Sequence, residues 1–311
     1  MSRLTRETFT GPWAGLPVAW TEDHQLDLHA YRQDVANCCL AGVPGVYTGG
    51  TTGEFYAMDW EEFCQVAQCT VETCRQHNVP SMIGCTSTYT RGAARRAEFA
   101  AEIGADAIQV ALPFWMELHD DEVVPFFTEV GQAAGELALS VYETTRAKLA
   151  LTLEQHQAIK QAVPRYMMVK SNAGTLGCTA EGCQALSQFV NVFVGESLWA
   201  ELGPHGAQGC CSSMVYWNPQ VTLGFWDQVA AANWDEVQRI HQQVMPLFEF
   251  LDSEYSGRGF TDTAYDRMGG LASGFLATSL NNRGPYRSPT AEDVALLRGW
   301  FEKHFPEMIV R

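Results

Sequence analysis

A single lysine ends the apolar run Tyr166-Met167-Met168-Val169-Lys170, and its chemistry sets it apart from the rest of the chain. Burying an ammonium group is costly, so a lysine in such surroundings tends to lose its proton and become a nucleophile. A neutral primary amine in a pocket forms Schiff bases with carbonyl compounds. The alternative is a lysine that extends its ammonium group to solvent at the end of a strand.

Two other predicted strand ends carry side chains that would complete such a site. One is followed by Gly49-Gly50-Thr51-Thr52-Gly53-Glu54, in which the glycines let backbone amides approach a ligand and the threonines add hydroxyl donors. This arrangement suits a carboxylate, although a tight turn before a helix has the same pattern. Tyr142 ends the other strand, and a phenol beside a cation can act as acid and base, whereas the alternative is a core tyrosine. Together the three strand ends predict a nucleophilic amine, a proton relay and a carboxylate anchor.

Short apolar runs alternate with longer amphipathic ones along most of the chain. The apolar runs are rich in Val, Ile and Ala and do not alternate with polar residues, as expected of strands buried on both faces. The predicted strands are 16–20, 45–48, 81–85, 107–112, 139–142, 166–170, 192–195 and 209–212. The predicted helices between them are 27–41, 59–77, 91–103, 120–134, 152–162, 179–188, 198–202 and 219–232.

Eight strand–helix units in about 230 residues predict a (β/α)8 TIM barrel over residues 1–232. Residues 233–311 are predicted to form a C-terminal helical region, packed on the barrel or on a partner subunit. Its predicted helices are 234–251, 263–277 and 291–304. A doubly wound sheet also alternates strands and helices, but no G-x-G-x-x-G pattern follows any strand. In a barrel the active site lies at the carboxyl ends of the strands, where Thr51, Tyr142 and Lys170 are placed.

The charge balance limits the partners of the protein. The chain of 311 residues has 20 basic and 36 acidic residues, a formal net charge of −16. Nucleic acids and anionic membranes would be repelled, whereas an anionic small substrate responds to the local field in its pocket and is not excluded. No apolar run approaches the roughly 20 residues of a membrane helix. Residues 1–10 lack the apolar core of a signal peptide, so we expect a cytoplasmic protein.

Ten cysteines are present, but their spacing does not indicate a disulfide framework or a metal site. No two of them form a C-x-x-C pair, and no histidine cluster completes a zinc set. A large chain without an export signal is also an unfavourable setting for disulfides. We therefore expect buried free thiols and no metal.

The motifs resemble those of the dihydrodipicolinate synthase / N-acetylneuraminate lyase family of Schiff-base aldolases. The residues that carry the resemblance are Gly49-Gly50-Thr51-Thr52-Gly53-Glu54, Val141-Tyr142 and Val169-Lys170, in this order. The similarity covers nearly the whole chain and includes Gly195-Glu196 and Gly209-Cys210-Cys211-Ser212.

The resemblance implies roles for individual residues. Lys170 would form an imine with pyruvate or another 2-oxo acid, and Tyr142 would relay protons with Thr51. The candidate substrate-binding residues are Thr52, Gly50, Gly53, Cys211, Trp115 and Arg146. Family members need no cofactor and are mostly tetramers built from tight dimers, so the resemblance implies a homo-oligomer.

The sequence departs from the synthase proper at two positions. The synthase has an arginine five residues after its tyrosine that binds the carboxylate of the second substrate; here the position is Ala147, between Arg146 and Lys148. The synthase also has a tyrosine after the fourth strand that is donated across the dimer. The corresponding residues here are Pro113-Phe114-Trp115, so this hydroxyl is missing.

Two Pro-containing stretches are more similar to the hydratase-aldolase branch of the family, which handles bulky or aromatic aldehydes. They are Pro113-Phe114-Trp115 and Gly11-Pro12-Trp13. An apolar pocket for the aldehyde would draw on Phe114, Trp115, Trp199 and Trp217, unless these side chains serve core or interface packing.

The leading hypothesis is therefore a Schiff-base lyase (aldolase, hydratase-aldolase or dehydratase) that acts on a 2-oxo acid through Lys170. One alternative is the dihydrodipicolinate synthase reaction itself, which joins pyruvate and aspartate semialdehyde. Another is a barrel that binds 2-oxo acids without turnover, which the two altered positions motivate. A phosphate- or flavin-binding barrel is disfavoured because the stretch after Ser212-Ser213 has no phosphate-cradling pattern.

Overall fold

The computed structural model describes residues 4–211 and 213–311. The chain divides into two compact units, each made of two separate stretches of sequence. Unit 1 consists of Met1–Gly11 and Pro80–Cys211, and unit 2 consists of Pro12–Val79 and Ser212–Arg311. The boundary predicted between residues 232 and 233 stays a prediction.

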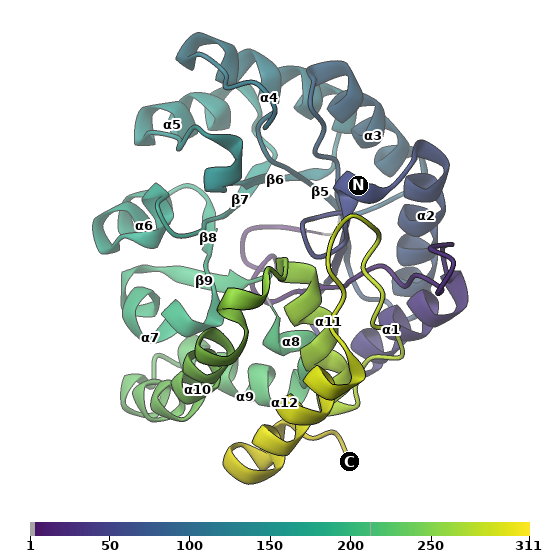
Figure 1. Ribbon diagram of the computed structural model, residues 1–311. Coiled ribbons are helices and arrows are strands. Elements are labelled where there is room, and N and C mark those ends of the chain that lie inside the picture. Colours follow the sequence, from purple (N-terminus) through teal and green to yellow (C-terminus); the bar gives the residue numbers. More distant parts are fainter. Residues whose placement is uncertain (1–3, 212) are drawn as a thin grey trace. The chain divides into compact units, whose positions relative to one another are not determined.

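Unit 1 is a run of parallel strands in which each strand pairs with the next one along the chain. The strands are β4 (Ser81–Gly84), β5 (Ala107–Val110), β6 (Ala138–Tyr142), β7 (Tyr166–Lys170), β8 (Asn191–Phe193) and β9 (Ala207–Cys210). The helices are α3 (Thr90–Glu102), α4 (Asp120–Ala134), α5 (Leu153–Ala162), α6 (Ala180–Leu186) and α7 (Trp199–Leu202). Helices α3 to α6 lie outside strands β5 to β8 (Figure 1).

The local sequence explains why these elements begin where they do. The Thr152 hydroxyl oxygen accepts a hydrogen bond from Gln155 N, and Thr152 N donates one to Gln155 Oε1, which forms a capping box at the start of α5. Acidic residues fill the first turn of α4, where they interact favourably with the helix dipole. Strands β4, β5 and β6 are buried along their whole length, as their uninterrupted apolar runs predict.

Unit 2 combines a short parallel strand pair with most of the C-terminal helices. Strand β2 (Ala14–Gly15) pairs with β3 (Val46–Thr48). The helices are α1 (Leu28–Leu40), α2 (Trp60–Gln76), α8 (Met214–Trp217), α9 (Pro219–Ala230), α10 (Trp234–Tyr255), α11 (Asp262–Ser273) and α12 (Ala291–His304). One apolar core joins them, including Trp20, Tyr31, Trp217 and Leu247.

Most predicted boundaries agree with the structure, but the first strand does not. Strands β1 (Gly11–Pro12) and β2 replace the predicted strand 16–20. Leu16 N still donates to Tyr47 O, and Pro17 then ends the ladder because proline has no N–H. Helix α8 was not predicted. The last predicted strand, 209–212, begins instead at Ala207, and Ser212 lies outside the described residues.

The cysteines are free thiols, and the described ones are buried or half-buried. No group of three or more His, Cys, Asp or Glu side chains within the described residues is placed to hold a metal ion. None of the helices in residues 4–211 and 213–311 is both long and apolar enough to cross a membrane.

Candidate active site

Lys170 and Tyr142 lie together at the carboxyl ends of two paired strands in unit 1. In the parallel register of β6 and β7, Tyr142 is opposite Lys170. The Nζ atom of Lys170 lies 4.5 Å from the centroid of the Tyr142 ring. Tyr142 is buried and Lys170 is half-buried, so the amine is partly withdrawn from solvent. The two residues singled out from separate motifs are thus in contact.

Sequence reasoning did not identify Asn172, which contacts the same tyrosine. Its Nδ2 atom donates a hydrogen bond of 3.3 Å to the Tyr142 hydroxyl oxygen. Residues two apart in an extended chain lie on the same side, and Asn172 is two residues after Lys170. This spacing was the one sequence signal for a polar side chain near the amine. The phenol oxygen accepts this bond, so Asn172 helps to orient the Tyr142 hydroxyl.

A buried polar cluster lies beside the end of β6, next to Tyr142. Glu143 Oε1 accepts a hydrogen bond from Leu151 N at 3.0 Å, and Glu143 Oε2 lies 3.3 Å from His156 Nε2 on α5. The other ring nitrogen of His156 is 2.8 Å from the Tyr166 hydroxyl. Burial and the charge of Glu143 raise the pKa of Tyr166 well above its usual value. The cluster therefore ties the end of β6 and the start of β7 to α5.

Cys211 lies directly after β9 in unit 1 and is buried. Burial raises the pKa of its thiol to about 12, and the charge of Lys170 opposes this change. The thiol is therefore neutral near pH 7, and Cys211 is suited to contact a ligand as a small apolar group rather than as a nucleophile.

Two further predicted residues lie on exposed loops of unit 1. Trp115 follows β5 and has 74% of its surface exposed. Arg146 belongs to the short 3-10 helix η2 (Thr145–Ala147) after β6, and it is also exposed. Lys148 Nζ donates a hydrogen bond of 2.6 Å to Trp115 O, which links the two loops.

The two other tryptophans considered for an apolar pocket are core residues. Trp199 is fully buried and donates from Nε1 to Gly209 O at 3.3 Å. Trp217 is also buried, and its Nε1 atom donates to Asp266 O at 3.1 Å. Their indole N–H groups are thus satisfied within the protein, and packing rather than a substrate explains these side chains.

The predicted carboxylate-binding segment is a glycine-dependent turn in unit 2. Gly49 and Glu54, at its two ends, have φ angles of 73° and 50°. A Cβ atom on Gly50 would lie 1.9 Å from the Tyr47 hydroxyl oxygen, and one on Gly53 would lie 2.5 Å from Gly49 N. The turn therefore excludes side chains at Gly50 and Gly53. Thr51 and Thr52, between them, are half-buried.

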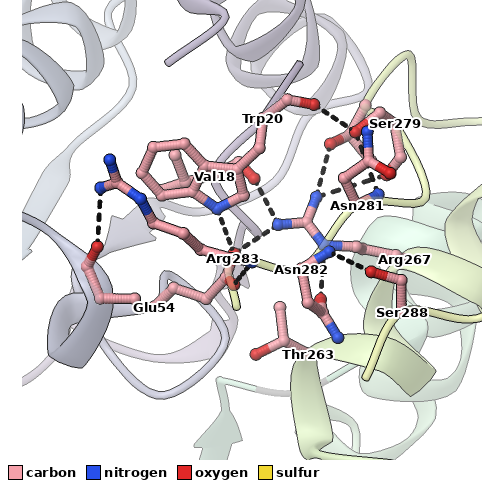
Figure 2. A network of polar contacts seen from close by, with 12 residues as sticks. Val18, Trp20, Glu54, Thr263, Arg267, Ser279, Asn281, Asn282, Arg283 and Ser288 are labelled. Carbon is pink, nitrogen blue, oxygen red and sulfur yellow. Dashed lines mark hydrogen bonds and ion pairs between the residues drawn. The ribbon is translucent and has the colours of Figure 1, made fainter. Parts of the chain in front are cut away.

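A buried ion pair holds the last residue of this turn (Figure 2). The Glu54 carboxylate pairs with the Arg267 guanidinium, and both side chains are inaccessible to solvent. It also accepts hydrogen bonds from Trp20 Nε1 at 2.8 Å and from Arg283 N at 3.1 Å. Burial lowers the pKa of Arg267, and the adjacent carboxylate opposes that change. The further acceptors of Arg267 are Val18 O, Thr278 Oγ1, Ser279 O and Asn282 Oδ1.

Comparison with known proteins identifies the fold and then the family. YagE, a prophage protein belonging to the dihydrodipicolinic acid synthase family from E. coli K12 and solved in complex with pyruvate, matches with a TM-score of 0.84 and 18% identity. The match covers 95% of this chain and 98% of that protein. The predicted fold class, a (β/α)8 barrel with a C-terminal helical extension, is confirmed.

The model of the dihydrodipicolinate synthetase family matches residues 8–273, and the chain belongs to this family. The trans-O-hydroxybenzylidenepyruvate hydratase-aldolase of Pseudomonas putida is 30% identical over 47% of this chain and 46% of that enzyme, so the chain spans about half the length of this relative. The 4-hydroxy-tetrahydrodipicolinate synthase of Exiguobacterium sibiricum is 25% identical over 79% of this chain and 84% of that enzyme.

Proposed function

We propose that this protein is a lyase that forms a Schiff base between the Lys170 amine and a 2-oxo acid of the pyruvate type. The observation that carries the proposal is the position of Lys170 Nζ, 4.5 Å from the Tyr142 ring centroid at the paired ends of β6 and β7. Membership of the dihydrodipicolinate synthetase family supports it. The names of the relatives, which include a hydratase-aldolase of a substituted pyruvate, agree with it.

Imine formation requires an uncharged amine and several proton transfers. The Lys170 nitrogen attacks the C2 carbonyl carbon, which gives a carbinolamine, and the loss of water then gives the imine. The Tyr142 phenol gives its proton to the alkoxide oxygen of the adduct and regains one from the nitrogen, and a second proton, taken from water and relayed through the same phenol, lets the hydroxyl group leave as water and gives the protonated imine. Asn172, which donates to the Tyr142 oxygen, keeps the phenol oriented for these steps.

The protonated imine then acts as an electron sink. When the bond between C3 and C4 of a 4-hydroxy-2-oxo acid breaks, the C4 hydroxyl gives up its proton to the relay and becomes the carbonyl group of the departing aldehyde, while the electron pair of the bond moves toward the imine nitrogen and an enamine forms. Protonation of the enamine and addition of water release the keto acid and regenerate Lys170. Condensation is the same sequence in reverse. By resemblance we assign the proton relay to Tyr142 with Thr51, and the carboxylate to Thr52 with the amides of Gly50 and Gly53.

Trapping tests this proposal directly. The protein is incubated with pyruvate, reduced with borohydride, digested and analysed by mass spectrometry. The proposal predicts a stable secondary-amine adduct on Lys170 that forms only when both reagents are present. Lys148 is an exposed lysine of the same unit and serves as the internal control for non-specific modification. An unmodified Lys170 peptide under conditions that trap a known family member contradicts the proposal.

Two aldehydes are candidates for the second substrate, which reacts with the 2-oxo acid. Ala147 stands where the synthase has its arginine, and the stretch Pro113-Phe114-Trp115 lacks the hydroxyl of its tyrosine, which favours an aromatic aldehyde, as in the hydratase-aldolase reaction. The synthase reaction with aspartate semialdehyde is the alternative. Turnover of pyruvate with a panel of aldehydes, from benzaldehydes to aspartate semialdehyde, distinguishes them. Preference for an aromatic aldehyde supports the first candidate, and preference for the semialdehyde supports the second.

A further inference from the structure

One face of helix α11 contacts the turn that contains Thr51 and Thr52. Thr263, Asp266 and Arg267 are three and four residues apart, so they lie on the same side of the helix. Both α11 and the turn belong to unit 2, although more than 200 residues of sequence separate them. Residues 233–311 were predicted as a helical appendage, but this helix faces a segment proposed to bind substrate.

The first contact fixes the backbone of the turn. The Thr263 hydroxyl donates a hydrogen bond of 3.2 Å to Thr51 O. Thr263 is fully buried, and its hydroxyl also lies 3.3 Å from the Tyr56 hydroxyl. The same Thr51 carbonyl accepts from Glu54 N at 3.0 Å inside the turn. The helix therefore adds a second donor to a carbonyl that already shapes the turn.

The second contact fixes the end of the turn. Arg267 pairs with Glu54 (Figure 2), and the side chains of both residues are inaccessible to solvent. Glu54 has a φ angle of 50°, a conformation that residues other than glycine adopt only when the surroundings impose it. The ion pair, together with the donors from Trp20 and Arg283, supplies that constraint.

The third contact reaches a side chain proposed to bind substrate. Asp266 is buried and accepts a hydrogen bond of 2.7 Å from the Ser213 hydroxyl. Burial raises the pKa of Asp266 to about 6, and the hydroxyl groups of Ser213, Thr52 and Tyr216 oppose this change. Asp266 thus places a buried carboxyl group near the Thr52 hydroxyl.

We propose that helix α11 is a positioning element of the substrate site: Thr263 and Arg267 hold the turn Gly49–Glu54 in the conformation that binds the carboxylate of a 2-oxo acid, and Asp266 lies near Thr52. The inference rests on the proposed function, because it takes the turn as the carboxylate anchor. Thr263 and Arg267 act through Thr51 and Glu54 and are positioning residues. A turn held at both of these residues loses little further entropy when the ligand binds.

Pyruvate binding by the full-length protein, measured by calorimetry, tests the inference with a matched series of variants. Thr263→Val removes the hydroxyl that donates to Thr51 O, and Thr263→Ser restores a hydroxyl. Thr222→Val is the control, because Thr222 is also a fully buried threonine of unit 2 whose hydroxyl bonds a backbone carbonyl, that of Asn218 in the same helical turn. The loss of one hydrogen bond corresponds to a change of about fivefold.

We expect Thr263→Val to weaken pyruvate binding about fivefold. We also expect Thr263→Ser and Thr222→Val to remain within about twofold of the wild type. If Thr263 had only a structural role, Thr263→Val and Thr222→Val would change the affinity for pyruvate equally. That result overturns the inference. It is also overturned if the wild type does not bind pyruvate. Binding that follows the predicted series without trapping of Lys170 by borohydride contradicts the proposed function and leaves the inference standing.

Discussion

The turn in unit 2 and the two loops in unit 1 are built in opposite ways, although both are proposed to contact substrate. Glu54, at the end of the turn, is inaccessible to solvent and accepts hydrogen bonds from three residues. On the loops after β5 and β6, Trp115 and Arg146 are exposed. The part assigned to the 2-oxo acid is therefore fixed by buried polar contacts, and the part assigned to the second substrate is not.

This difference suggests how one fold can keep its chemistry and change its substrate. Substitutions in an exposed loop usually alter stability by less than about 0.5 kcal/mol, whereas removing one partner of a buried ion pair costs about 3–5 kcal/mol. The loops can therefore vary at little cost in stability.

Replacement of the nucleophile has the largest effect on turnover. Lys170→Arg keeps the positive charge and most of the volume but cannot form an imine. We expect turnover to fall by at least about 10³-fold, with an unfolding temperature close to that of the wild type. Residual activity within tenfold of the wild type, measured with the best aldehyde, would mean that Lys170 is not the nucleophile.

Removal of the proton relay comes next. Tyr142→Phe keeps the ring against Lys170 and deletes only the hydroxyl. The proposed role predicts a loss of about 10²- to 10⁴-fold in turnover. Pyruvate binding should change much less, because the carboxylate is assigned elsewhere. An unchanged kcat would show that the Tyr142 hydroxyl carries no proton in the rate-limiting step.

Removal of the buried ion pair between Glu54 and Arg267 tests how firmly the turn in unit 2 is held. Arg267→Met leaves the Glu54 carboxylate buried without its cation, and we expect the free energy of unfolding to fall by about 3–5 kcal/mol. The control is Arg91→Met in unit 1, where the pair with Glu98 is exposed and contributes about 1 kcal/mol or less. Denaturant titration measures both variants. Equal losses would contradict the contrast between a buried and an exposed pair.

A pH series tests another buried carboxylate of unit 2. Burial raises the pKa of Asp34 from 3.8 to about 6, although Ala277 N donates a hydrogen bond to it. The folded state thus holds this proton more tightly than the unfolded state. The contribution of Asp34 to the free energy of unfolding should therefore decrease as the pH rises from about 4 to about 6, by about 3 kcal/mol in total. Asp34→Asn should lose this decrease in thermal unfolding experiments, and equal pH profiles would contradict the assignment.

The smallest effects are expected on the exposed loops. Arg146→Ala and Trp115→Ala should each change the free energy of unfolding by less than about 0.5 kcal/mol. Both should leave borohydride trapping by pyruvate unchanged, while the ratio of turnover between two aldehydes shifts. Loss of trapping in either variant would mean that these loops act on the 2-oxo acid itself.

The strand ends could be predicted from the sequence because local patterns specify them. The run Tyr166–Lys170 is a strand as predicted, and the register of β6 and β7 places Tyr142 beside its lysine. The first strand could not be placed as well, since its apolar pattern extends past Pro17, where the ladder ends.

The role of α11 could not be predicted from the sequence. Thr263 and Arg267 meet residues 212 and 213 positions away, and no motif marks them. Their spacing identifies a helix face but not what that face contacts. The same holds for Glu143 and His156, whose buried pairing depends on how α5 packs beside β6. Contacts of this kind are set by tertiary packing and not by local pattern.

A crystal structure of the protein soaked with pyruvate would show whether Lys170 forms the imine. We expect continuous electron density from Lys170 Nζ to C2 of the ligand, with the phenol of Tyr142 beside the new bond and the carboxylate held by Thr52 and its neighbouring amides. An unmodified Lys170 side chain, with pyruvate bound elsewhere or absent at saturating concentration, would contradict it.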